Sequence, residues 1–255
     1  MNDRPLVVDN VSFSFGSVGV FERISLSIDR GEFVAVVGPS GCGKTTLLNL
    51  FSQFIKPDSG RVMCTERVRM VYQTDSLFPW QTVRENIELG LRSLTDKAER
   101  TRQLGEMLKL IKLEGFANHY PHQLSGGMRQ RVELARALIG DSDILLLDEP
   151  FSSLDYLTRI RMRNELARML DQLPRTVVLV THDIEEAAQL ADRIVVLSDR
   201  PARICSEFYV ELARPRELTH PTVVTTVHEI LAELGLEHEG RQTGSNDQVR
   251  GQIVR

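Results

Sequence analysis

One stretch, from Gly38 to Thr46 (GPSGCGKTT), constrains the fold of this chain more than any other. An apolar run at 32–37 precedes it and predicts a buried parallel strand, and an apolar run at 47–51 follows it and predicts a helix. A glycine, four further residues and Gly-Lys-Thr between a strand and a helix form the pattern of a phosphate-binding loop. Its glycines let backbone N–H groups turn toward a polyphosphate, and the helix N-terminus adds positive potential. The stretch therefore predicts a nucleotide-binding α/β domain.

Individual side chains of this loop have distinct predicted roles. We expect Lys44 to reach the β- and γ-phosphates of the nucleotide and the Thr45 hydroxyl to coordinate Mg²⁺. Cys42 is expected to serve only as a small residue, and a redox-sensing thiol is the alternative. The rest of the loop is expected to line the nucleotide: Gly38, Pro39, Ser40, Gly41, Gly43 and Thr46.

A second helix N-terminus that suits an anion is predicted far along the chain. Ser125, Gly126 and Gly127 lie in the stretch LSGGMRQR at 124–131, just before an evident helix at 132–138. The exposed N–H groups and the dipole of such a terminus favour negative charge. Few folds need two of these termini, so the second one narrows the classes of nucleotide-binding protein that fit.

Two acidic residues follow the apolar run at 144–147, which predicts a fully buried strand. Asp148 and Glu149 are thereby delivered to the carboxyl end of a parallel sheet, where α/β proteins bind ligands. Asp148 suits a Mg²⁺ contact through water, and Glu149 is placed to polarise an attacking water. The alternative is a buried structural pair. His182 follows another apolar run, 177–180, and either hydrogen-bonds a γ-phosphate or is structural.

The segments that flank the phosphate-binding loop are less specific. Alternating residues at 6–15 and 24–28 predict a small antiparallel sheet packed on the parallel core, and Phe15 either stacks on an adenine or fills the core. The run from Leu77 to Trp80 contains the only tryptophan, which is expected in the core or on a partner-binding surface. Thr82 and Glu85 predict a capping box for the next helix.

Composition limits the classes of partner and compartment. The formal net charge of −4 does not indicate a general nucleic-acid surface, so no nucleic-acid partner is expected. Three cysteines without metal-like spacing fit a reducing compartment. The N-terminus lacks a secretory signal pattern, and no apolar run approaches the ~20 residues that span a bilayer. We expect a cytosolic chain unless another component holds it at a membrane.

Taken together, these residues resemble the ATP-binding subunit of an ABC (ATP-binding cassette) transporter over about 6–234. The most specific part is the stretch at 124–131, which resembles the signature motif that other phosphate-loop ATPases lack. Further positions of the family correspond here to the Q-loop glutamine Gln73, the Walker B pair Asp148 and Glu149, the D-loop aspartate Asp155 and the switch histidine His182.

The resemblance also adds contacts to the expected nucleotide site. Phe15 falls where the family places an adenine-stacking aromatic residue, and Gln130 belongs to the signature stretch that closes over the nucleotide. The expected cofactors are ATP and Mg²⁺, with Thr45, Gln73 and Asp148 as the metal-binding residues. One ATP would lie on the loop of one copy and under the signature helix of another, so two copies would pair head to tail.

The implied fold is an ABC-type α/β ATPase with a RecA-like parallel-sheet core, an N-terminal antiparallel β subdomain and an α-helical signature subdomain. The domain is expected over 1–235, with the helical subdomain at about 75–140 and a disordered tail at 236–255. The interval between Gly60 and Val68 looks shorter than in similar importers, which leaves its strand pairing open.

Finer likeness points to bacterial importers of nitrate, sulfonate, taurine or bicarbonate. The expected partners are a second ATP-binding subunit, permease subunits that dock on 74–91 and, indirectly, an extracytoplasmic solute-binding protein. The expected location is the cytoplasmic face of the inner membrane. Alternatives are a DNA-repair or ribosome-associated ATPase, an exporter and a catalytically dead cassette; Glu149 and His182 argue against the last of these.

Overall fold

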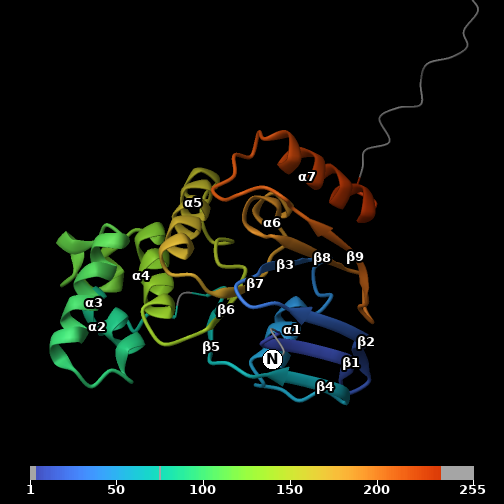
Figure 1. The fold of residues 1–255 in the computed structure, drawn as a ribbon, viewed down its shortest axis with the longest axis horizontal. Coiled ribbons are helices and arrows are strands. Elements are labelled where there is room, and N and C mark those ends of the chain that lie inside the picture. Colours follow the sequence, from blue (N-terminus) through green and yellow to red (C-terminus); the bar gives the residue numbers. More distant parts are fainter. Residues whose placement is uncertain (1–3, 75, 237–255) are drawn as a thin grey trace, which may run out of the picture.

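A six-stranded sheet with the order β5-β6-β7-β3-β8-β9 forms the centre of the computed structural model, which describes residues 4–74 and 76–236 (Figure 1). The five strands β5, β6, β7, β3 and β8 are parallel to one another, and β9 pairs antiparallel with β8. The strands predicted at 32–37, 144–147 and 177–180 are confirmed. Their bounds are β3 (Phe33–Val37), β5 (Val68–Val71), β6 (Ile144–Asp148), β7 (Thr176–Val180), β8 (Arg193–Leu197) and β9 (Ile204–Tyr209).

The central strands are apolar throughout because both faces of the sheet are covered. In β3, Phe33, Ala35 and Val37 face one hydrophobic core. Val34 and Val36 point to the opposite face and belong to a second core. Because successive side chains of a strand point to opposite faces, each strand contributes to the hydrophobic core on both sides of the sheet. The first layer holds most of the helices, and the second holds α1 (Lys44–Phe51) and the antiparallel sheet.

The predicted antiparallel sheet is present with the order β2-β1-β4. Its strands are β1 (Leu6–Phe15), β2 (Val18–Ile28) and β4 (Ser59–Cys64). The pairing that the sequence left open is settled by the ladder between β4 and β1, in which Leu6 lies opposite Cys64 and Val8 opposite Val62. β1 and β2 form a hairpin that closes at Phe15 and Val18.

Between β5 and β6 the chain forms a helical region, coloured from teal to yellow-green in Figure 1. The predicted capping box is confirmed: Thr82 and Glu85 satisfy each other's backbone N–H groups at the start of the first helix. The elements are α2 (Val83–Glu88), η1 (Leu89–Leu91), α3 (Lys97–Leu110), η2 (Glu114–Phe116), η3 (Pro121–Gln123) and α4 (Gly126–Leu138).

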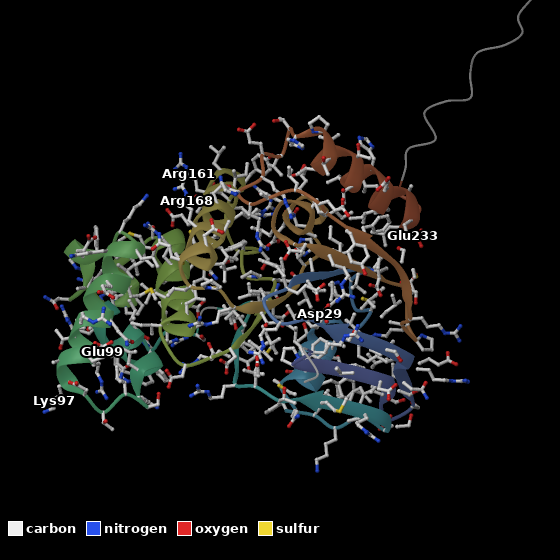
Figure 2. All side chains as sticks on the ribbon, viewed as in Figure 1. Asp29, Lys97, Glu99, Arg161, Arg168 and Glu233 are labelled. Atoms are coloured by element: carbon white, nitrogen blue, oxygen red, sulfur yellow. The ribbon has the colours of Figure 1, made fainter. Side chains whose placement is uncertain are left out.

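Three further helices pack into the same core as the helical region, on the face of the sheet opposite α1: α5 (Tyr156–Gln172), α6 (Ile184–Leu190) and α7 (Pro221–Glu233). α5 is amphipathic, with Arg161 and Arg168 exposed (Figure 2) and Met162 and Leu166 in the core. Among residues 4–74 and 76–236, no helix combines the length and apolarity that a membrane span requires. The domain limits stay a prediction, and the expected disordered tail lies, from residue 237 on, outside the described residues.

Candidate functional site

The phosphate-binding loop leaves the carboxyl end of β3 and enters α1 at Lys44. Gly43 has a φ of 117°, and a Cβ on it would lie 2.6 Å from Cγ1 of Val20 and 2.9 Å from Cζ of Phe21. A side chain therefore fits neither the backbone conformation nor the space. The antiparallel hairpin thus packs directly against the loop, which explains why glycine is needed here.

The Lys44 side chain folds back over the loop. Its Nζ donates hydrogen bonds to the carbonyl oxygens of Gly38 (2.9 Å) and Pro39 (3.0 Å), and the residue is 7% exposed. This places an ammonium group across the concave side of a loop whose backbone is already bent for an anion. Ser40, Gly41 and Thr45 are exposed along the same loop. The arrangement fits a polyphosphate.

Cys42 is buried in the loop, at 2% exposure. Burial raises the pKa of its thiol, although the positive charge of Lys44 opposes the shift. Because reactive cysteines are accessible thiolates, this environment favours the small-residue interpretation over a redox sensor.

Thr45 and Asp148 meet where the loop helix and the acidic strand end face each other. The Thr45 hydroxyl donates to Oδ1 of Asp148 at 3.0 Å, across 103 residues of sequence. Burial raises the pKa of Asp148, with the Thr45 hydrogen bond opposing the shift and the charge of Glu149 adding to it. A hydroxyl and a carboxylate are hard oxygen donors of the kind that Mg²⁺ uses together with substrate phosphates.

Glu149 contacts both Gln73 and His182, the other two residues predicted to take part in catalysis. Nε2 of Gln73 donates to its Oε2 at 3.2 Å, and Nδ1 of His182 lies 3.0 Å from the same oxygen. Gln73 also lies 3.4 Å from the hydroxyl of Ser152, a contact that sequence reasoning missed. One carboxylate oxygen thus joins the ends of β5, β6 and β7.

The backbone of Glu149 is in the left-handed region, with a φ of 44°. A non-glycine residue there carries strain of order 1–3 kcal/mol, which persists only where the surroundings hold it. Here the Glu149 N–H donates to the carbonyl of Val180 at 2.9 Å, one step beyond the β6–β7 ladder. The strained turn aims the carboxylate away from the strand and toward Gln73 and His182. The sequence contains no signal for this turn.

A buried polar network lies directly behind His182. The Thr181 hydroxyl donates to Oε2 of Glu186 at 2.7 Å and accepts from the N–H of Asp183. Asp183 also caps α6. Burial raises the pKa of Glu186 to about 7.

Two arginines of α5 complete this network. Arg159 donates to Asp183 at 3.0 Å, and the fully buried Arg163 contacts the same carboxylate oxygen. Burial alone would raise the pKa of Asp183, but the arginine charges outweigh it and lower the pKa. The network ties the loop that carries His182 to α5. The four-residue spacing of these arginines places them on one helix face, a signal that could have predicted a buried acidic partner.

The signature residues and Asp155 form a second, separate hollow of about 340 Å³. Ser125 caps α4 by accepting from the N–H of Met128, and Asp155 caps α5 by accepting from the N–H of Thr158. The hydrogen bond with Thr158 also lowers the pKa of Asp155. The N-termini of α4 and α5 therefore border the same hollow, whose lining includes Ser125, Gly126, Gly127 and Asp155.

Two predicted contacts have contrasting surroundings. Phe15 is 57% exposed and packs edge-on against Phe13, so its outer face is open, as stacking on an adenine requires. Gln130 is only 8% exposed and lies on the same face of α4 as the buried Leu134 and Ala137. Gln130 therefore does not line the hollow that Ser125, Gly126 and Gly127 help to form.

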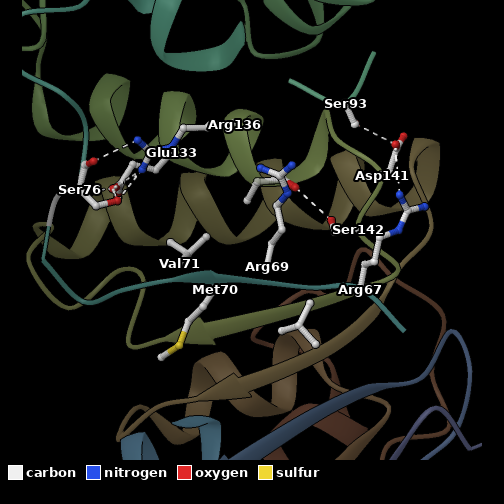
Figure 3. Close-up of a pocket in the computed structure, with 12 residues that line it drawn as sticks. Arg67, Arg69, Met70, Val71, Ser76, Ser93, Glu133, Arg136, Asp141 and Ser142 are labelled. Carbon is white, nitrogen blue, oxygen red and sulfur yellow. Dashed lines mark hydrogen bonds and ion pairs between the residues drawn. The ribbon is translucent and has the colours of Figure 1, made fainter. Parts of the chain in front are cut away.

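The chain after Gln73 is anchored to α4, at a hollow of about 610 Å³ beside the edge strand β5 (Figure 3). The Ser76 hydroxyl and N–H donate to Oε1 of Glu133 at 2.7 and 2.6 Å. Arg136 donates to the Ser76 carbonyl at 3.0 Å. The helix that begins at the signature residues therefore holds the segment that begins at Gln73.

The apolar segment after Ser76 is divided between core and surface. Trp80 is 69% exposed and Phe78 is 38% exposed, with their ring centroids 5.4 Å apart. The core interpretation of Trp80 is therefore wrong. Leu77, from the same run, is 7% exposed and belongs to the core.

Comparisons with known proteins agree with this geometry. The family described as ABC transporter matches residues 21–152. The aliphatic sulfonates import ATP-binding protein SsuB 1 of Shouchella clausii is 42% identical over 228 residues, which cover 89% of this chain and 90% of that protein. The taurine import ATP-binding protein TauB of Pelagibacter ubique is 40% identical over 232 residues, covering 84% and 87%.

A solved structure shows the same fold. The dimeric structure of MJ0796, a bacterial ABC transporter cassette, superposes with a TM-score of 0.69 at 34% identity, covering 82% of this chain and all of that one. A second dimeric structure of that cassette is a post-hydrolysis state bound to ADP and Pi, with a TM-score of 0.68 at 33% identity.

The features that define an ATP-binding cassette are all present. They are the phosphate-binding loop on a parallel sheet, the acidic residues at the end of β6 and the separate hollow at the starts of α4 and α5. The chain belongs to the ABC transporter family and is an ATPase of that family.

Proposed function

We propose that this chain is the ATP-hydrolysing subunit of an importer for a small solute of the sulfonate, taurine, nitrate or bicarbonate class. The relatives named for aliphatic sulfonates and taurine favour a sulfonate among these. The observation that carries the catalytic part is the single oxygen of Glu149 shared by Gln73 and His182. Such a carboxylate, one residue after the Asp148 that contacts Thr45 of the phosphate-binding loop, suits the activation of water.

In this proposal Glu149 is the general base. It removes a proton from the water whose oxygen attacks the γ-phosphorus, while the bond from that phosphorus to the bridging oxygen of ADP breaks. Lys44 balances charge on the β- and γ-phosphates. His182 moves from the carboxylate to the γ-phosphate and stabilises the charge that develops there.

The metal-binding residues of the proposal are Thr45, Asp148 and Gln73. Their hydroxyl, carboxylate and amide oxygens are hard donors that fit Mg²⁺. When bound, Mg²⁺ neutralises charge on the phosphate oxygens.

Two copies of the chain act together in this proposal. The phosphate-binding loop and the hollow at Ser125, Gly126, Gly127 and Asp155 have no lining residue in common, so each chain offers two half-sites. A head-to-tail pair would close each loop with the partner's hollow, with Phe15 stacked on the adenine. The two dimeric structures of the similar cassette support the pairing of two copies.

The remaining partners follow from the importer class. We place the permease contact on 74–91, where Trp80 and Phe78 expose aromatic surface beside the segment that Ser76 anchors to α4. The chain would then lie on the cytoplasmic face of the inner membrane, with a solute-binding protein acting on the other side through the permease.

Deletion and complementation test this function. In the source organism, removal of the chain should abolish growth on taurine or an alkanesulfonate as the sole sulfur source, whereas growth on sulfate should continue. Wild-type protein should restore growth, and Lys44→Ala, expressed at the same level, should not. Growth of the deletion strain on every sulfonate would contradict the proposed substrate class, and restoration by Lys44→Ala would contradict an ATP-driven role.

A further inference from the structure

The loop between β8 and β9 contacts the hairpin that carries Phe15. A Cβ on Gly19, just after the hairpin turn, would lie 3.7 Å from Cγ of Pro201. The N–H of Ala202 donates to the carbonyl of Val20 at 2.7 Å, and the N–H of Glu22 donates back to the carbonyl of Ala202 at 3.2 Å. These bonds fix the loop beside the expected adenine side of the nucleotide site.

The same loop also touches the phosphate-binding loop. At the end of β8, the carbonyl oxygen of Leu197 would lie 2.9 Å from a Cβ on Gly38. Further on, Nη2 of Arg200 would lie 3.7 Å from a Cβ on Gly41, which is contact distance without a clash. Gly41 has a φ of 79°, a left-handed conformation that favours glycine and helps to give the loop its shape. The guanidinium of Arg200 thus lies beside the polyphosphate cradle.

Arg200 is exposed and forms no hydrogen bond or ion pair with any of residues 4–74 and 76–236. Neighbouring arginines differ in this respect. Arg203 pairs with Glu22 at 2.6 Å, and Arg193 pairs with Glu32 and Glu207. An exposed guanidinium without a carboxylate, next to a loop built for an anion, has its strongest available partner in a phosphate.

The influence of Arg200 on the loop is also electrostatic. Its charge favours the thiolate of Cys42, as does that of Lys44, although burial outweighs both and raises the pKa of the thiol. Arg200 therefore acts at the loop from a segment that lies outside the glycine-lysine-threonine pattern.

We propose that Arg200 binds the nucleotide polyphosphate from the outer side of the phosphate-binding loop, as a second cation beside Lys44. The proposal rests on the nucleotide site described above. It assigns to the loop between β8 and β9 a direct role in nucleotide affinity, because that loop contacts both Phe15's hairpin and Gly41.

Calorimetric titration of the full-length chain with ADP tests the proposal. ADP is chosen because its binding to one copy does not require closure by a partner. Arg200→Gln removes the charge and keeps a polar side chain, and Arg200→Lys keeps the charge. Arg203→Gln is the matched control, since it removes a nearby surface arginine that already has a carboxylate partner. Lys44→Ala reports on the loop itself, and melting temperatures check that every variant is folded.

We expect Arg200→Gln to raise the Kd for ADP by about 5- to 20-fold, the range of a partly exposed charge-assisted hydrogen bond. Its affinity should also depend less steeply on salt than that of the wild type. Arg200→Lys should retain most of the affinity, and Arg203→Gln should remain within about twofold of wild type. Equal affinities for Arg200→Gln and Arg203→Gln would overturn the role of Arg200. Unchanged binding by Lys44→Ala would instead overturn the nucleotide site on which the proposal rests.

Discussion

Oε2 of Glu149 lies 3.0 Å from Nδ1 of His182, although 33 residues separate them in sequence. The contact exists because β6 and β7 are parallel neighbours with Asp148 opposite Val180, so both residues leave the sheet at one edge. The strained backbone of Glu149 then turns its carboxylate toward the imidazole. The proposed base and its neighbour are therefore positioned by the sheet.

Replacement of the proposed base Glu149 should separate ATP binding from ATP cleavage. Glu149→Gln keeps the size of the side chain and its contact with Gln73, but it cannot take a proton from water. We expect hydrolysis to slow by ~10²–10⁴-fold, with ATP affinity nearly unchanged. The uncleaved nucleotide should then hold two copies together on size-exclusion chromatography with ATP and Mg²⁺. The same variant with ADP is the control, and a monomer at high concentration under both conditions would contradict the head-to-tail pair.

His182→Ala should reduce catalysis more than affinity. Its imidazole is half-exposed and would meet the γ-phosphate mainly as charge develops in the transition state. We expect turnover to fall by ~10²-fold or more, whereas the Kd for ATP should change by less than about threefold. His220→Ala, on the distant start of α7, is the control for loss of an imidazole. An equal fall of affinity and turnover would show that His182 is structural.

Glu186 should make stability depend on pH. Its pKa is raised by burial from 4.5 to about 7 in the folded chain, so the folded state holds a proton that the unfolded state releases between these values. Its stabilising contribution is therefore complete below about pH 4.5 and is lost as the pH rises through about 7. The charged groups that face it are Arg163, Arg159 and Asp183.

Chemical unfolding at a series of pH values checks this prediction. Relative to Glu186→Gln, which cannot ionise, the wild type should lose about 1–3 kcal/mol of unfolding free energy between pH 5 and 8. Glu185→Gln, which changes the exposed neighbour, should follow the wild type. Parallel pH curves for all three proteins would mean that Glu186 does not titrate in this range.

The parts of the site that the sequence predicted are those set by local patterns. The strand, glycines and helix around Lys44, and the capping box at Thr82, depend on neighbouring residues only, and both are present. The burial of Gln130 could have been predicted from the sequence, because the apolar Leu134 and Ala137 lie on the same helix face. A prediction from the motif alone ignored that periodicity.

Other features arise from contacts between distant segments and have no local signal. The hydrogen bond between Gln73 and Glu149 joins residues 76 positions apart, and the left-handed backbone at Glu149 depends on the adjoining strand. The exposure of Trp80 was equally undecided, since a short apolar run packs inward or outward depending on what covers it. In this chain the Leu77 side chain is buried in the core, whereas the Trp80 side chain is exposed.

This exposure makes the last prediction sharp. Because Trp80 is 69% exposed, its truncation removes little buried area, and Trp80→Ala should destabilise the isolated chain by less than ~1 kcal/mol. Basal ATP hydrolysis should also be retained. An aromatic anchor in an interface is worth more than ~2 kcal/mol, so co-purification with the permease from detergent-solubilised membranes should fall strongly. Phe54→Ala, which truncates an 80% exposed aromatic residue in the loop after α1, should leave assembly unchanged. A large drop in melting temperature without loss of assembly, or equal loss of assembly in both variants, would remove Trp80 from the permease contact.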